Sequence, residues 1–141
     1  IMHRNLGKLF ITFATLFYGI VPLIADLNES HLLNPSWMPH AKFHLAWLLG
    51  TNCLLAFYSI YLIWFSHLVI QAGLMGILIM SGFWVAAIFK DFYGGLLVDP
   101  DRDAPMILGL NPNIFFFTLV TGFLVVGVAL ELRKISYKNI L

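Results

Sequence analysis

The sequence predicts an all-α fold: a polytopic membrane protein built as a bundle of four transmembrane helices. Of its 141 residues, 60% are apolar and only 11% are charged, and the mean hydropathy is +0.88. A soluble globular domain typically has about 45–50% apolar and about 25% charged residues. A soluble chain of this length could not keep so much apolar surface from water, because a large share of its residues must lie at the surface.

Four long apolar runs are the second observation behind this prediction. A bilayer core about 30 Å thick requires roughly 20 apolar residues in a helix that rises about 1.5 Å per residue. The expected spans cover residues 8–25, 43–65, 68–89 and 114–132. We expect residues 1–141 to form a single four-span membrane domain, because these runs leave little chain for a soluble one.

The sequence around each run supports this division in chain order. The first run follows basic residues but ends without a small-x-small cleavage site, so we expect a retained span rather than a removed signal. Pro39 precedes the second run and suits the first turn of a helix, where its missing N–H costs nothing. Ser66 and His67 leave room only for a tight turn before the third run, and a longer loop precedes the fourth.

The third and fourth runs contain small residues at which helix backbones can approach closely. These residues are Ala72, Gly73, Gly76 and Gly82 in the third run, and Thr118, Thr121, Gly122 and Gly127 in the fourth. We expect them to pack the helices of one chain together. An oligomer interface made of the same residues is the alternative.

Basic residues near the ends of the runs predict the orientation, because cytoplasmic loops are enriched in Lys and Arg. The residues close to the two chain ends are Arg4, Lys8, Arg133, Lys134 and Lys138. Few basic residues lie in the loops of about 26–42 and 90–113, where acidic residues accompany them. We therefore expect both termini to be cytoplasmic and both long loops to be exoplasmic.

Several functional classes are excluded by composition and motifs. With a net charge of +1, the chain has no basic surface with which to hold nucleic acid. It contains no Walker, dinucleotide-binding, HExxH, nucleophile-elbow or CxxC pattern, and the single cysteine, Cys53, cannot form an internal disulfide. The central two-thirds of each run contains no Asp, Glu, Lys or Arg, so we expect no buried charge and disfavour a transporter.

The polar residues gather in the loop between the first two spans and the start of the second. The candidate functional residues of this segment are Asp26, Asn28, His31, Asn34, Trp37, His40, Lys42 and His44. If a helix starts at Pro39, His40 and His44 stand at i and i+4 on one face. Asp91, near the end of the third span, is the expected outside partner of these two histidines, because both loops share a face.

Three interpretations of this segment stay open. His40 and His44 could share a divalent transition metal with His31 and Asp26, since two imidazoles one helical turn apart can bind one cation. The same residues could act as a general acid–base pair for a lipid-like substrate. Otherwise they cap helices, fold the loop and contact lipid headgroups. In the second loop, the acids Asp99, Asp101 and Asp103 lack the glycine and the closing glutamate of an EF-hand, so we expect a solvated acidic turn.

The run from Ala25 to His44 reads A-D-L-N-E-S-H-L-L-N-P-S-W-M-P-H-A-K-F-H. It resembles the pattern A-D-x-N-x-T-H-x-x-N-P-x-W-P-P-H-A-[RK]-F-H, which marks an uncharacterised family of small four-helix membrane proteins. That family is catalogued under a domain of unknown function, and some members are automatically labelled acetyltransferases. Met38 and Ser30 depart from the pattern. The resemblance implies that this loop defines the family, but the sequence has no coenzyme A pocket pattern and the label is not carried over.

The sequence thus predicts an accessory subunit of a membrane complex or a binder of a lipophilic ligand, with the polar loop as its recognition surface. Its expected partners are membrane lipids and other membrane-protein subunits, and a bound lipid is the expected cofactor-like group. The alternative is a membrane-embedded enzyme, metal-dependent or acid–base, that acts on a lipid-like substrate. This alternative predicts that Asp26, His31, His40 and His44 converge.

Overall fold

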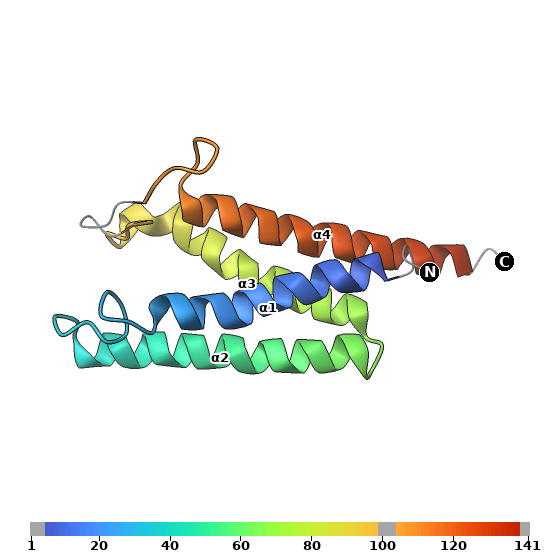
Figure 1. Ribbon diagram of the computed structural model, residues 1–141, viewed down its shortest axis with the longest axis horizontal. Helices are drawn as coiled ribbons and strands as arrows, with labels where there is room; N and C mark the ends of the chain where they lie inside the picture. Colours follow the sequence, from blue (N-terminus) through green and yellow to red (C-terminus); the bar gives the residue numbers. More distant parts are fainter. Residues whose placement is uncertain (1–4, 99–103, 139–141) are drawn as a thin grey trace.

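The computed structural model describes residues 5–98 and 104–138 (Figure 1). Its elements are, in order, α1 (Leu6–Asp26), α2 (Pro39–Trp64), α3 (Val69–Phe89), the short 3-10 helix η2 (Lys90–Phe92) and α4 (Pro112–Lys138). Within the described residues, extended pairing is limited to one isolated bridge, between Ile107 and Leu110. The predicted all-α fold is therefore confirmed. Asp99, Asp101 and Asp103, expected to form an acidic turn, lie outside the described residues.

The helices differ from the predicted spans mainly at their ends. α2 begins at Pro39, four residues before the predicted span, as expected for a proline that suits the first turn of a helix. α4 continues past residue 132 to Lys138, because charged residues such as Arg133 and Lys134 are good helix formers even where apolar character ends. Hydropathy therefore predicted where the apolar part of each helix lies, and capping chemistry and propensity determine where the helix stops.

All four helices are long and apolar enough to cross a membrane. No more than 28% of the apolar stretch of any helix is buried inside the bundle. Large apolar side chains such as Leu54, Leu78 and Val125 are exposed instead. Soluble proteins rarely expose contiguous apolar surface on this scale. The four predicted spans are thus present as four outwardly apolar helices.

α1 lies at the centre of the arrangement and contacts each of the other three long helices (Figure 1). α3 crosses the bundle obliquely, from the turn after α2 towards the start of α4. Figure 1 also shows that the start of α1 and the end of α4 lie at the same end of the bundle as the α2–α3 turn. We call this the terminal end. The opposite end, which carries the segments 27–38, 93–98 and 104–111, is the loop end.

Small residues allow the helices to approach closely. A Cβ atom on Gly76 of α3 would lie 2.7 Å from Leu124 of α4, and one on Gly127 of α4 would lie 3.1 Å from the carbonyl oxygen of Gly7. Gly82 and Gly122 have open space around them instead. The predicted small-residue packing therefore involves the first half of α3 and the second half of α4, where Ile11 of α1 also lies against both helices.

Candidate functional site

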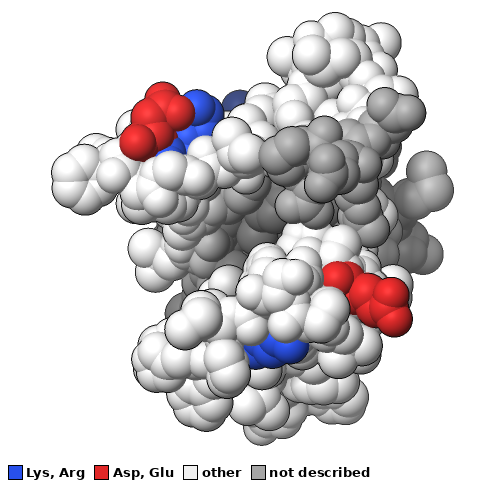
Figure 2. All heavy atoms as spheres, turned by 90° about the vertical axis from the view of Figure 1, so that its left-hand side faces the viewer, with Lys and Arg blue, Asp and Glu red and all other residues white. Residues whose placement is uncertain are grey.

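The loop end presents a largely uncharged face, on which acidic and basic side chains are few and one acidic and one basic group lie against each other (Figure 2). Segment 27–38 forms the part of this face between α1 and α2. Its backbone folds back on itself: the Leu32 N–H donates to the Asp26 carbonyl at 3.0 Å, and the Leu33 N–H donates to the Asn28 carbonyl at 2.9 Å. The segment is therefore a folded loop with internal hydrogen bonds.

Asn28 is the centre of this loop. Its Oδ1 accepts hydrogen bonds from the Ser30 N–H at 2.9 Å and the Ser30 hydroxyl at 2.6 Å, and its Nδ2 donates to the Ala25 carbonyl at 2.6 Å. This is the Asx-turn chemistry by which asparagine replaces a backbone turn. One side chain thus connects the end of α1 to the first turn of the loop.

Asn34 repeats this chemistry one turn further on. Its Oδ1 accepts from the Ser36 N–H at 2.9 Å, and its Nδ2 donates to the Ser30 carbonyl at 3.4 Å. Of the candidate residues, Asn28 and Asn34 therefore hold the shape of the loop. Their amides are occupied by the loop itself.

His31 is oriented by three neighbours. Its Nδ1 lies 2.8 Å from the Ser30 hydroxyl, its Nε2 lies 3.9 Å from Asp26 Oδ1, and its ring meets Trp37 edge-to-face at 6.0 Å between centroids. The Asp26 contact is an ion-pair distance rather than a hydrogen bond. Asp26 and His31 thus form one pair, half-buried beneath the loop.

His40 and His44 form a second pair on the first turns of α2. Both are exposed, and their Nε2 atoms lie 3.0 Å apart, so one ring donates a hydrogen bond to the other. The ring of His40 stacks with Phe43, and the ring of His44 stacks with Trp47. The exposed fraction of both Phe43 and Trp47 is 62%. The helix start at Pro39 places these four side chains at i, i+3, i+4 and i+7, and we call them the α2 face.

The predicted metal set is not brought together. Over residues 5–98 and 104–138, no three of the His, Cys, Asp and Glu side chains come close enough to hold a metal ion. Asp26 and His31 pair with each other, as do His40 and His44. The expectation that all four converge is wrong in this structure, because the loop turns His31 towards α1 and Trp37, whereas α2 presents its histidines outward.

Asp91 does not have the partner that the sequence predicted, and Lys42 lies apart from it on α2. The Asp91 carboxylate, in η2, pairs with the ammonium of its neighbour Lys90 and not with a histidine of α2. Asp91 is strongly exposed, so this pair is a surface contact that contributes little to stability. Lys42 lies half-buried in the second turn of α2.

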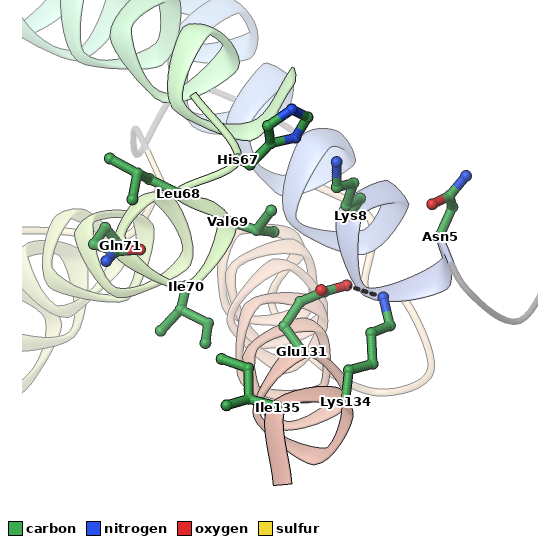
Figure 3. A pocket seen from close by; sticks show the side chains of 10 residues that line it. All are labelled: Asn5, Lys8, His67, Leu68, Val69, Ile70, Gln71, Glu131, Lys134 and Ile135. Atoms are coloured by element: carbon green, nitrogen blue, oxygen red, sulfur yellow. Dashed lines mark hydrogen bonds and ion pairs between the residues drawn. The ribbon is translucent and has the colours of Figure 1, made fainter. Parts of the chain in front are cut away.

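Sequence reasoning missed a second site, a pocket of about 890 Å³ at the terminal end (Figure 3). Its walls come from α1, the α2–α3 turn with the first turn of α3, and α4. Glu131 of α4, only 8% exposed, lines it and forms an ion pair with Lys134. The expectation of no buried charge is therefore wrong.

Glu131 is buried because Gly7 and Gly127 have no side chains. A Cβ on Gly7 would collide with the Glu131 carboxylate, which occupies that space. The sequence held one signal for this arrangement: Glu131 is the one carboxylate in the fourth apolar run, and Gly127 lies one helical turn before it on the same face. The contribution of Gly7, from the other end of the chain, had no such signal.

The four helices that are long and apolar enough to cross a membrane point to a multi-pass membrane protein with a folded polar loop. Residues 10–139 match a family described as a family of unknown function (DUF6640), and the chain belongs to this family. The predicted membership of an uncharacterised family is thus confirmed. No match was found among curated proteins or among solved structures.

Proposed function

We propose that this protein is a non-catalytic accessory subunit of a membrane complex and that it recognises its partner at the loop end. The observation that carries the proposal is the α2 face, the exposed row of His40, Phe43, His44 and Trp47. Side chains at i, i+3, i+4 and i+7 are the anchors by which a helix docks against another surface. Aromatic residues of this kind dominate the binding energy of protein interfaces.

The folded loop beside the α2 face supports the same proposal. Asn28 and Asn34 hold the loop in one shape before any partner binds. A recognition surface that is already ordered loses less conformational entropy on binding. Trp37 fixes the ring of His31 at the junction between the loop and α2. The loop and the α2 face together give a surface on which exposed aromatic side chains lie beside polar ones, as they do where the apolar core of an interface meets its polar rim.

We further propose that both termini face the cytoplasm and that the loop end is exoplasmic. The basic residues Lys8, Arg133 and Lys134 lie on the helices that reach the terminal end. At the loop end, Lys90 is paired with Asp91. The excess of positive charge therefore belongs to the terminal end, which is the pattern of cytoplasmic segments.

Site-specific photo-crosslinking tests the subunit proposal. A benzophenone-bearing residue is placed at Phe43 or Trp47 in cells that normally make the protein. The matched control carries it at Phe57, an aromatic residue of the same helix with an exposed fraction of 70%. We expect a discrete protein adduct of one mass from positions 43 and 47 and none from position 57. Native mass spectrometry of the detergent-extracted complex then gives its stoichiometry.

The variant Phe43→Ala/Trp47→Ala is expected to lose this complex, whereas Phe57→Ala/Phe65→Ala is expected to keep it. Phe65 directly follows the last residue of α2 and is 74% exposed, so each double variant removes two exposed aromatic rings. Three results would overturn the proposal: adducts with lipid alone, which would assign the face to a lipophilic ligand; an adduct with a second copy of this chain; or equal crosslinking from all three positions.

The alternative of a membrane enzyme has one observation in its favour. His40 and His44 share a hydrogen bond at 3.0 Å, and such a pair can accept and release a proton. Lipid composition distinguishes the two functions. A lipid species that changes when the wild type is expressed, but not when His40→Ala/His44→Ala is expressed, would support the enzyme. An unchanged lipid profile, with loss of the complex in Phe43→Ala/Trp47→Ala, supports the accessory subunit.

A further inference from the structure

The pocket at the terminal end carries an inference that is independent of the loop end. Three parts of the chain that are far apart in sequence form its walls: the start of α1, the α2–α3 turn with the start of α3, and the end of α4 (Figure 3). A volume of about 890 Å³ is within the range of small-molecule sites. The pocket is therefore large enough for a polar group of a small molecule together with part of an apolar chain attached to it.

The lining divides into a polar and an apolar part. Polar groups come from all three walls: Lys8 from α1, His67 and Gln71 from the turn and α3, and Glu131 and Lys134 from α4. Residues 68–70 and Ile135 supply the apolar part. A molecule that satisfies both parts has a polar head joined to an apolar body. Such a molecule is an amphiphile.

The charges of the polar part favour an anionic head. Glu131 and Lys134 form an ion pair with each other, whereas the Lys8 ammonium lies 5.5 Å from the centre of the Trp64 ring, outside any carboxylate pair that the structure describes. The indole of Trp64 is itself held by a hydrogen bond to the Thr12 hydroxyl at 3.2 Å. The cation of Lys8 is thus positioned by an aromatic ring at the edge of the pocket and adds one net positive charge to its walls.

The height of the pocket in the bundle favours a membrane lipid over a soluble amphiphile. Lys8 and Glu131 lie close to the ends of the apolar helices α1 and α4. At this level a spanning helix passes from the acyl chains to the headgroups, and basic residues there attract anionic lipids. The apolar part of the lining continues onto the outward surface of the helices, where Leu68 and Ile135 are exposed.

We propose that this pocket binds the phosphate-bearing headgroup of an anionic phospholipid, with Lys8 as its main charge contact. The proposed ligand combines a negatively charged phosphate with apolar acyl chains. A free phosphate ion has the negative charge but lacks the acyl chains, so an experiment can distinguish a lipid from inorganic phosphate.

Native mass spectrometry of the purified full chain in a phosphate-free detergent tests the proposal. The protein is titrated with phosphatidylglycerol, with phosphatidylcholine and with inorganic phosphate. The variants are Lys8→Gln, which removes the cation, and Glu131→Gln, which adds one net positive charge to the same walls. Lys42→Gln is the matched control, because Lys42 is a half-buried lysine of the loop end.

We expect one phosphatidylglycerol to bind the wild type more tightly than phosphatidylcholine. Loss of one lysine contact weakens such binding about fivefold, so Lys8→Gln is expected to raise the Kd by about that factor. Glu131→Gln is expected to lower the Kd, and Lys42→Gln to leave it unchanged. The proposal is wrong if both lipids bind equally, if Lys8→Gln and Lys42→Gln have the same effect, or if inorganic phosphate alone occupies the site. A failure here leaves the crosslinking test at the loop end unaffected.

Discussion

The hydroxyl groups of Tyr18 and Ser59 lie 2.8 Å apart in the buried centre of the bundle, where they join α1 to α2. Their exposed fractions are 1% and 0%. Both residues are buried, so a hydroxyl left without a hydrogen bond here would be costly. In a bilayer, where apolar helices gain little by leaving lipid for one another, such a bond helps to define which helices associate.

Removal of one partner of this bond should destabilise the bundle. Tyr18→Phe leaves the Ser59 hydroxyl buried without its partner, and we expect the free energy of unfolding to fall by about 1 kcal/mol. Unfolding by sodium dodecyl sulfate in mixed micelles measures this change. Tyr61→Phe is the control, because Tyr61 lies on the same helix as Ser59 with an exposed fraction of 54%. In Tyr18→Phe/Ser59→Ala the two losses should be less than additive; full additivity would mean that the bond contributes nothing.

Close approach of α1 and α4 should depend on Gly127. A Cβ there would lie 2.7 Å from Ile11 Cγ1 and 3.1 Å from the backbone carbonyl of Gly7, so the two helices would have to separate. We expect Gly127→Ala to lower the free energy of unfolding by roughly 1–3 kcal/mol. Gly122→Ala, on the same helix in open space, should be neutral or stabilising by up to about 1 kcal/mol. If the two variants unfold alike, the packing between α1 and α4 is not the one described.

Order in the polar loop should depend on Asn28. Asn28→Ala removes the acceptor of two hydrogen bonds from Ser30 and the donor to the Ala25 carbonyl. Because a net hydrogen bond contributes about 1 kcal/mol, we expect amide hydrogen exchange in residues 30–34 to accelerate roughly fivefold or more. Hydrogen–deuterium exchange in detergent measures this directly. Glu29→Ala, at an exposed neighbouring position, should leave the exchange unchanged.

The proposed orientation predicts opposite accessibility of the two ends of the bundle. In a Cys53→Ala background, a membrane-impermeant maleimide applied to intact cells should label Glu29→Cys at the loop end and spare Ser136→Cys at the terminal end. Both positions are exposed in the structure, so both should react after permeabilisation. Leu78→Cys, in the middle of α3, should stay unlabelled throughout. The reverse pattern would place the termini on the exoplasmic side.

The fold could be predicted from the sequence because its main determinants are local. Each apolar run is a property of a single segment, and Pro39 alone indicates where α2 begins. The candidate residues of the loop could also be recognised from the sequence, because polar residues cluster there in an otherwise apolar chain. Which of them hold the loop and which are presented outward could not be predicted. That division depends on the hydrogen bonds that Asn28 makes once the loop is folded.

Non-local packing explains what the sequence did not reveal. Glu131 is buried because Gly7 leaves space for its carboxylate, and these residues are separated by almost the whole chain. Asp91 was expected to reach a histidine of α2, but its carboxylate forms an ion pair with the adjacent Lys90 instead. The first of these contacts depends on how α1 and α4 pack, and patterns within one segment contain no information about that packing. The second joins adjacent residues, and it removes the need for a distant partner of Asp91.

The position of α1 has a consequence for how the protein is made. α1 contacts the other three long helices, and at Gly7 it closely approaches α4, which leaves the ribosome after α1, α2 and α3. Translation adds about 5–20 residues per second, so α1 waits in the bilayer on the order of ten seconds before that neighbour exists. During this interval α2 is the first partner available to it, through Tyr18 and Ser59. The α1–α2 hairpin is therefore the first packed unit that the unfinished chain can present to the cell's membrane-insertion and quality-control machinery.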